Sequence, residues 1–217
     1  MVKHHKEAFD RISEEKRSRI LHSAIDEFSS MGFSNANINE IARNAGVSIG
    51  SMYNYFNSKE DLFLTLINHA YQKLEEAISN VNLQDGDIFE KLERLVRAAQ
   101  DHAKKNRKMI QIYLDMTSEG LTLLSKRLSR KMETITAEFY HRLIINAKKN
   151  GLIRSDVDEK VASFCIDNLI LLLQFSYTTD YFRERMKIFA GKNALKEDER
   201  IVQGIIKFMR YGLCGKP

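Results

Sequence analysis

Residues 37–59 decide the fold of this chain, and they read NINEIARNAGVSIGSMYNYFNSK. Asn37 and Glu40 stand three apart, which is the spacing of a capping box at the start of a first short helix. Gly46 supplies the left-handed residue that ends this helix. Ser48 then caps a second helix. The stretch therefore predicts two short helices joined by a tight turn.

The second of these helices has one apolar face and one polar face. Met52 and Phe56 are four residues apart, so they lie on the same side and are expected to turn inward. The residues left on or near the outer side are Ile49, Ser51, Tyr53, Asn54 and Tyr55. A pair of helices with polar and aromatic side chains outward on the second is how a helix-turn-helix is built for the DNA major groove.

The rest of the sequence predicts an all-α protein. Its 217 residues are enough for one large domain or two modest ones. Pro217 is the one proline, and it is the last residue, so no proline ring interrupts a helix inside the chain. Valine and isoleucine do not alternate with polar residues, so no segment is a candidate strand.

The cysteines and the apolar segments favour a cytoplasmic protein. Cys165 and Cys214 lie far apart in apolar helical contexts, which suits buried thiols better than a disulfide framework or a metal site. The N-terminus lacks the apolar stretch of a secretory signal. Residues 161–177 form the most apolar segment, but three polar residues interrupt it, which indicates a core or interface helix and not a membrane span. The interrupting residues are Asp167, Asn168 and Gln174.

The formal net charge of +5 is not evidence for DNA binding by the N-terminal region. Residues 1–80 contain 9 lysines and arginines and 11 acidic residues, a balance of −2. Residues 91–154 contain 15 and 6, a balance of +9. The case for DNA contact therefore depends on where the charges are placed. The basic middle region is expected to be a solvated helical surface, with an anionic effector or partner as the alternative.

Apolar residues at three-and-four spacing predict helices on both sides of the motif. The expected helices cover residues 13–30, a segment that begins at Ser58, 87–106, 107–118, 121–150, 156–185 and 197–212. Residues 80–86 are a predicted linker, and Glu119-Gly120 is a predicted break. We therefore expect a DNA-binding domain at 14–74, with its recognition motif at 37–56, and a helical ligand-binding and dimerisation domain at 80–217.

Residues 20–62 resemble the N-terminal domain of the tetracycline-repressor (TetR) family of transcriptional regulators. The shared residues are Ala24 to Phe28, Gly32-Phe33, Ile41-Ala42, Ala45-Gly46-Val47-Ser48, Gly50, Tyr53, Phe56 and Lys59-Glu60-Asp61-Leu62. This string is specific because it extends over three helices and both of their turns. The remaining helices match the family only in kind.

The resemblance implies a three-helix DNA-binding domain in a homodimer that binds a near-palindromic operator on double-stranded DNA. Such proteins are usually repressors released by a small-molecule effector. Carried over by position, the DNA-contacting residues are Asn37, Asn39, Ser48, Ile49, Gly50, Ser51, Tyr53, Asn54, Tyr55 and Lys59.

Three of these positions need comment. Asn37 stands where the family usually has Ser or Thr, and Tyr55 stands where His is commonest. For Tyr55 the alternative to a phosphate contact is burial against the first helix. Lys59 is expected to meet phosphate at a helix N-terminus, with a solvated lysine as the alternative.

The basic arm at residues 3–6 is expected to be a disordered tail, with minor-groove binding as the alternative.

The two final apolar helices are expected to form a four-helix dimer seam, with plain intramolecular core as the alternative. The seam residues are Leu169 to Leu173, Phe175, Tyr177, Phe208 and Tyr211. An effector site is expected on the middle helices, where polar atoms stand beside aromatic and methionine side chains. Its candidates are Tyr113, Met116, His141, Phe164, Asn168 and Phe175, with Asp115 and Tyr140 nearby. The effector is expected to tilt the helix that begins at Ser58.

The sequence contains no catalytic constellation, so we do not expect an enzyme. Its histidines lack metal-ligand spacing with cysteines or carboxylates, and no glycine-rich phosphate loop occurs, so no metal site or cofactor is expected. Two rival functions stay open. One is a helical enzyme or ligand-binding protein with a vestigial DNA-binding motif, and the other is a regulator that acts mainly through protein partners. Effector identity, operator sequence and the direction of regulation are not readable from the residues.

Overall fold

The structure, a computed structural model, describes residues 3–79, 85–118 and 122–214. Within these residues every regular element is a helix, which confirms the predicted all-α fold. In chain order the elements are α1 (Glu7–Asp10), α2 (Glu14–Asn35), α3 (Ile38–Ala45), α4 (Ile49–Tyr55), α5 (Lys59–Ser79), α6 (Ile88–Lys105), α7 (Arg107–Ser118), α8 (Thr122–Lys149), α9 (Glu159–Ser176), α10 (Asp180–Ala190), the 3-10 turn η1 (Ala194–Lys196) and α11 (Asp198–Cys214). Residues 80–84 of the predicted linker and the predicted break at Glu119-Gly120 lie outside the described residues.

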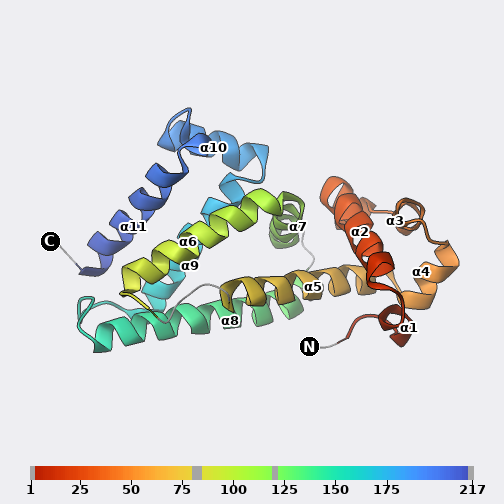
Figure 1. Cartoon of the computed structure of the whole chain (residues 1–217), viewed down its shortest axis with the longest axis horizontal. Coiled ribbons are helices and arrows are strands. Elements are labelled where there is room, and N and C mark those ends of the chain that lie inside the picture. Colours follow the sequence, from red (N-terminus) through yellow and green to blue (C-terminus); the bar gives the residue numbers. More distant parts are fainter. Residues whose placement is uncertain (1–2, 80–84, 119–121, 215–217) are drawn as a thin grey trace.

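The molecule is elongated, with its N-terminal helices at one end (Figure 1). Helices α1 to α4 form that end, while α6, α9, α10 and α11 lie toward the other. Helices α5 and α8 extend along the long axis, and α7 lies between the two ends. The predicted recognition motif and the predicted dimer seam are therefore at opposite ends of the molecule.

The turn between α3 and α4 has the predicted geometry. Gly46 has φ 66° and ψ 38°, a left-handed conformation that costs glycine little, and it ends α3. The Val47 N–H donates to the Ala42 carbonyl at 3.0 Å. The Ser48 hydroxyl accepts from the Ser51 N–H at 3.1 Å and so caps α4. Met52 is completely buried, so the two helices are held at a fixed angle.

The predicted capping box at the start of α3 is wrong in one half. The Asn37 side chain does cap the helix, accepting from the Asn39 N–H at 2.9 Å. The Asn37 N–H, however, donates to Glu27 Oε1 of α2 at 2.9 Å, while Glu40 pairs with Arg43. Glu27, a carboxylate of the neighbouring helix, therefore accepts the hydrogen bond that local spacing assigned to Glu40.

The N-terminal arm packs on the protein instead of forming the expected disordered tail. The Lys6 N–H donates to the Tyr55 carbonyl at 2.8 Å, and the Lys6 ammonium donates to the Tyr53 carbonyl at 2.7 Å. Phe9 of α1 is 2% exposed, and its ring centroid lies 4.8 Å from that of Phe56. The arm and α1 therefore satisfy carbonyl groups that the C-terminus of α4 leaves free.

The predicted single helix at residues 156–185 is two helices, α9 and α10, bent by 110°. Tyr177 follows α9 and is 2% exposed; its hydroxyl accepts from Gln100 of α6 at 2.6 Å and donates to Asp198 at 3.2 Å. The Thr179 hydroxyl accepts from the Phe182 N–H and caps α10. The break between α9 and α10 thus depends on long-range hydrogen bonds, which the spacing of apolar residues in the sequence cannot predict.

Two hydrophobic clusters divide the molecule, and α7 belongs to both. Ile112 and Met116 of α7 are buried in the cluster that contains α1 to α5. Ile110 of α7 is buried in the cluster of the C-terminal helices. Lys108 pairs with Asp26 of α2 at 2.7 Å. The N-terminal core therefore includes a helix from far along the chain, and the domain ranges 14–74 and 80–217 stay proposals.

Both cysteines differ from the sequence prediction, because Cys165 and Cys214 are exposed and not buried. Cys165 lies on an outward side of α9, next to the exposed Phe164. In the described part of the chain, no single helix is long and apolar enough to cross a membrane. The bent pair α9 and α10 does meet that test by length and composition.

Met52→Ala is expected to destabilise the N-terminal core by about 2–5 kcal/mol, because the side chain is fully buried and its loss leaves a cavity. Met31→Ala is the matched control, since Met31 is 50% exposed and its truncation should change stability by less than about 0.5 kcal/mol. Denaturant unfolding followed by circular dichroism measures both. Equal losses in the two variants would contradict the packing described for α4.

Candidate functional site

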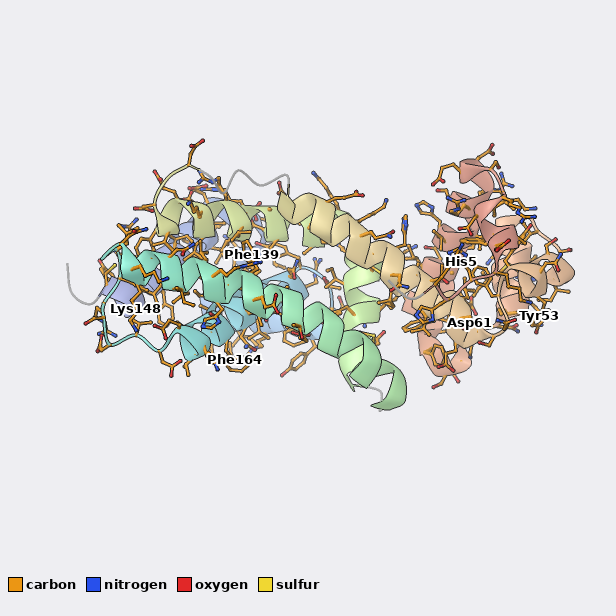
Figure 2. The ribbon with its side chains drawn as sticks, turned by 90° about the horizontal axis from the view of Figure 1, so that it is seen from below. His5, Tyr53, Asp61, Phe139, Lys148 and Phe164 are labelled. Carbon is orange, nitrogen blue, oxygen red and sulfur yellow. The ribbon has the colours of Figure 1, made fainter. Side chains whose placement is uncertain are left out.

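The outer side of α4 is a solvent-facing surface at one end of the molecule. Figure 2 shows Tyr53 at that end. Tyr53 is 53% exposed and Ile49 is 38% exposed, although both are large side chains. Other predicted DNA-contacting residues on this end are exposed or half-buried; they are Asn37, Asn39, Ser48, Gly50, Ser51 and Asn54. The surface therefore offers hydroxyl, amide and aromatic groups with little desolvation to overcome.

Hydrogen bonds fix the start of α4 in place. The Ser48 and Ser51 hydroxyl groups lie 2.9 Å apart and within hydrogen-bonding distance. The Ser51 N–H also donates to the Ser48 side chain. Short side chains held in this way bring the backbone close to any surface that α4 meets, and Gly50 between them adds no side chain. This arrangement suits close approach to a groove.

Tyr55 does not lie on the outer side, and the prediction that placed it there is wrong. It is 7% exposed, and its ring centroid lies 5.8 Å from that of Phe9. The Lys16 ammonium of α2 lies 5.5 Å from the ring centroid. The alternative given in the sequence analysis, burial against the first helix, is the one the structure shows, because α1 and α2 cover the Tyr55 ring. Its expected phosphate contact would involve at most the edge of the side chain.

Lys59 is held by the protein more tightly than either sequence interpretation assumed. Its ammonium donates to the Ser34 carbonyl at 2.9 Å and to the Ala36 carbonyl at 3.0 Å. It also lies 5.0 Å from the Phe33 ring centroid. Because an ammonium has three donors, one remains for another acceptor. Lys59 therefore joins the start of α5 to the last turn of α2 and the residue that follows it, and any phosphate contact would be added to that structural role.

A second candidate site is a cavity of about 170 Å³ between α5, α6, α7, α8 and α9. Its walls are mainly apolar, with Ile67 from α5, Leu95 from α6, and Met109 and Ile110 from α7. The polar groups at its lining are His102, Tyr113, Glu133, Thr136, Tyr140, Asp167 and Gln174. An apolar cavity with a few polar groups on one side is the usual form of a small-molecule site.

The polar groups of this cavity have perturbed ionisation. Burial, with the nearby charge of Glu133, raises the pKa of Asp167 to about 6. Burial also raises the pKa of Tyr113, whose hydroxyl donates to Glu133 at 2.7 Å, and that of Tyr140. Burial lowers the pKa of His102. Shifts of this kind are typical of ligand sites.

The sequence located the region of this cavity but few of its residues. Of the six candidates, Tyr113 lines the cavity. Phe175 does not line it but is buried next to Tyr113, with their ring centroids 6.3 Å apart. The remaining candidates do not line it. Met116 is in the N-terminal core, Phe164 is 69% exposed, and His141 and Asn168 are half-buried elsewhere. Tyr140, also named from the sequence, does line it, whereas Asp115 does not.

Sequence reasoning missed Glu133 and Asp167 as cavity residues. A signal for Asp167 was present, because Asp167 and Gln174 interrupt the apolar segment seven residues apart and so share a face of α9. For α8 the corresponding signal is the spacing of Glu133, Thr136 and Tyr140. Among the residues that the structure describes, no three His, Cys, Asp or Glu side chains are arranged to hold a metal ion.

A third feature is an exposed apolar surface on the C-terminal helices. On α9 Phe164 is 69% exposed and Leu172 is 45% exposed. On α11 Phe208 is 69% exposed and Tyr211 is 47% exposed. Four of the predicted seam residues, Ile170, Leu173, Phe175 and Tyr177, are instead buried in the core of the same chain. The alternative, plain intramolecular core, therefore applies to those four, while Leu172, Phe208 and Tyr211 are exposed and available to a partner.

These features define a class of protein: a helical helix-turn-helix regulator with a separate ligand-sized cavity. Residues 20–66 match the family described as "Bacterial regulatory proteins, tetR family". This match covers the helix-turn-helix region, and in it the chain is similar to the TetR family of transcriptional regulators.

Known proteins of similar sequence and structure agree with this assignment. The HTH-type transcriptional regulator YdgC of Bacillus subtilis is 24% identical over 93% of this chain and 94% of its own. The HTH-type transcriptional repressor NicS of Pseudomonas putida is 29% identical over 72% of this chain and 71% of its own. The crystal structure of AibR in complex with isovaleryl coenzyme A and operator DNA has the same fold, with a TM-score of 0.68 and 20% identity over 90% of this chain and 97% of AibR.

Asp167→Asn is expected to stabilise the protein at alkaline pH. The folded state raises the pKa of this carboxyl from 3.8 to about 6, so it binds more protons than the unfolded chain in that interval. Stability therefore falls as pH rises through about 6. Asparagine removes the buried charge, so the melting temperature at pH 8 should rise by about 2 °C or more. Near pH 4 the variant and the parent protein should melt close together.

Thermal unfolding at both pH values measures this effect, and Asp101→Asn is the control because Asp101 is exposed on α6 and does not line the cavity. A stability gain that is the same at pH 4 and pH 8 would show that Asp167 is not the buried acid described.

Proposed function

We propose that this regulator is a dimeric, sequence-specific DNA-binding repressor that a small molecule in the central cavity releases from its operator. The observation that carries this proposal is the outer side of α4, where Tyr53 and Ile49 stay exposed while Met52 on the opposite side is completely buried. A helix anchored on one side, with aromatic and short polar groups on the other, suits insertion into the major groove. The repressor name of NicS supports the direction of regulation.

Within this proposal, α4 reads bases and the residues around it position the helix. Ile49, Gly50, Ser51 and Tyr53 face base edges, with Ser48 at the start of the same surface. Asn37, Asn39, Asn54 and Lys59 serve the phosphate backbone, while the buried Tyr55 supports α4 from the protein side. Because the base-facing side chains are short and few, DNA shape contributes to specificity as well. The arm at residues 3–6 supports α4 from behind, and this is why we assign it no minor-groove role.

A dimer gives the two recognition helices a fixed spacing. A second copy would place them roughly 34–36 Å apart, one turn of DNA, on a near-palindromic operator. The exposed surfaces of α9 and α11 support this step. On α11, Gly204 and Gly212 lie four residues before and after Phe208, and nothing lies within 4 Å of a Cβ added at either glycine. Small residues beside a large apolar one favour close helix packing.

Effector binding acts through the two helices that touch both the cavity and the N-terminal core. Ile67 of α5 lines the cavity and is buried in that core. Met109 and Tyr113 of α7 line the cavity and pack against the same core. Movement of α7 would reach α2, because Ile112 and Met116 of α7 are buried in the core that contains α2 and Lys108 pairs with Asp26. The coupling required is typically ~1–3 kcal/mol.

DNA footprinting on the upstream region of the protein's own gene tests the proposal, and a protected site with two-fold symmetry is expected. Tyr53→Ala should weaken binding to that site by about tenfold or more, because it removes a side chain at the base edges. Tyr181→Ala is the matched control, since Tyr181 is 70% exposed on α10, outside the N-terminal helices. Tyr53→Ala should leave the melting temperature unchanged because Tyr53 is exposed.

The outcomes separate the proposal from its rivals. Normal DNA binding by Tyr53→Ala would remove α4 from the interface. Tight small-molecule binding without DNA affinity would favour a ligand-binding protein or enzyme. Dependence of DNA binding on a second protein would favour a regulator that acts through partners.

Phe208→Asp is expected to break the dimer, because a buried unpaired carboxylate at a helix seam costs several kcal/mol. The variant should elute as a monomer in size-exclusion chromatography with light scattering and lose affinity for the two-fold operator. Lys105→Asp, a substitution to the same acid at an exposed position of α6, is the control and should stay dimeric. A Phe208→Asp dimer as tight as the parent would exclude α11 from the seam.

A further inference from the structure

Among the described residues that line it, the central cavity has two carboxylates and no lysine or arginine. Asp167 lies at its lining and is half-buried, and Glu133 lies at its lining in a more exposed position. Among the described residues, the ion pairs include neither of these carboxylates. His102, the basic side chain at the lining, has a pKa lowered by burial, so it stays neutral near pH 7. A buried carboxylate without a partner is costly unless something pairs with it.

Two tyrosines stand beside these carboxylates. The Tyr113 hydroxyl donates to Glu133 at 2.7 Å, which holds that carboxylate at the cavity. Tyr140 of α8 is 7% exposed and lines the cavity, so its ring and hydroxyl are placed to contact an occupant. Tyrosine rings near carboxylates are the usual surroundings of an organic cation.

The remainder of the cavity is apolar and small. Leu95, Ile110 and Ile170 contribute aliphatic side chains to its walls. A volume of about 170 Å³ is close to that of engineered cavities that hold one benzene ring, which are roughly 150 Å³. The occupant is therefore a compact group, with its apolar part against these walls and its polar part toward α8 and α9.

We propose that the effector is a small hydrophobic cation, an aryl or alkyl amine or quaternary ammonium, whose charged group lies between Asp167, Glu133 and the rings of Tyr113 and Tyr140. This inference rests on the proposed function, because it names the ligand class of the proposed effector site. A carboxylate or phosphate in the same place would meet two like charges in a medium where water screens them poorly. The chemistry of this cavity thus differs from what an anionic ligand requires.

Isothermal titration calorimetry on the full-length protein tests the ligand class directly, with three probes of similar size. Benzyltrimethylammonium is the cation, neopentylbenzene is its neutral isostere, and 3-phenylpropanoate is an anion. The cation is expected to bind at least tenfold more tightly than the neutral isostere, and the anion is expected not to bind. Glu133→Gln and Asp167→Asn should each weaken cation binding at least threefold without weakening the neutral isostere.

Glu138→Gln is the matched control, because Glu138 is exposed on α8 and does not line the cavity. It should bind the cation as the parent protein does. Equal affinity for the cation and the neutral isostere, preference for the anion or an acyl-coenzyme A, or unchanged cation binding in both carboxylate variants would each overturn the inference. Thermal unfolding of each variant without ligand shows that it is folded.

The failure of this inference is distinguishable from the failure of the proposed function. The same cation is added to the operator complex, and release is followed by gel shift. Operator binding without any cation binding overturns the ligand class alone. If the cation binds with the expected preference over the neutral and anionic probes but does not release the operator, the ligand class is supported and the proposed release mechanism is overturned.

Discussion

The burial of Met52 and Phe56 beneath the turn at Gly46 is the constraint on which the functional surface depends. Both side chains are completely buried, so α4 has one orientation about its axis and its opposite side faces solvent. The arm adds to this constraint, because Lys6 donates to the carbonyls of Tyr53 and Tyr55 at the end of the helix. A short helix of 7 residues has little stability of its own. Tertiary contacts therefore determine which side chains DNA would meet.

The second organising feature is the membership of α7 in both cores. Ile112 and Met116 pack with the N-terminal helices, whereas Ile110 packs with the C-terminal ones. Packed interiors transmit displacement because they contain little free volume. Tyr113 lies at the cavity and against both cores, so a ligand there would contact the element that connects them. The sequence placed α7 in the C-terminal domain alone, so only α5 was expected to carry the effect of the ligand. The structure adds α7 as a second connection between the cavity and the N-terminal core.

Local chemistry allowed much of the fold to be predicted from the sequence. Gly46 and Ser48 mark the ends of α3 and α4 because a left-handed residue and a hydroxyl cap act within one turn. Long-range contacts explain the errors. Tyr55 is buried because Phe9 packs on it, and the chain bends after α9 because Tyr177 bonds to Gln100 and Asp198. The exposure of the outer side of α4 was predictable for the same local reason. The cavity is lined from five helices, so spacing within any one helix could not show which residues meet there.

The central claim is that the outer side of α4 enters a groove of duplex DNA. Photocrosslinking from a benzophenone amino acid at position 53, with operator DNA from the gene's own upstream region, tests it most directly. The account predicts covalent attachment to bases in both half-sites, with none when the same group is placed at position 181 on α10. Attachment to protein alone from position 53, or to DNA from position 181 but not from 53, would contradict it.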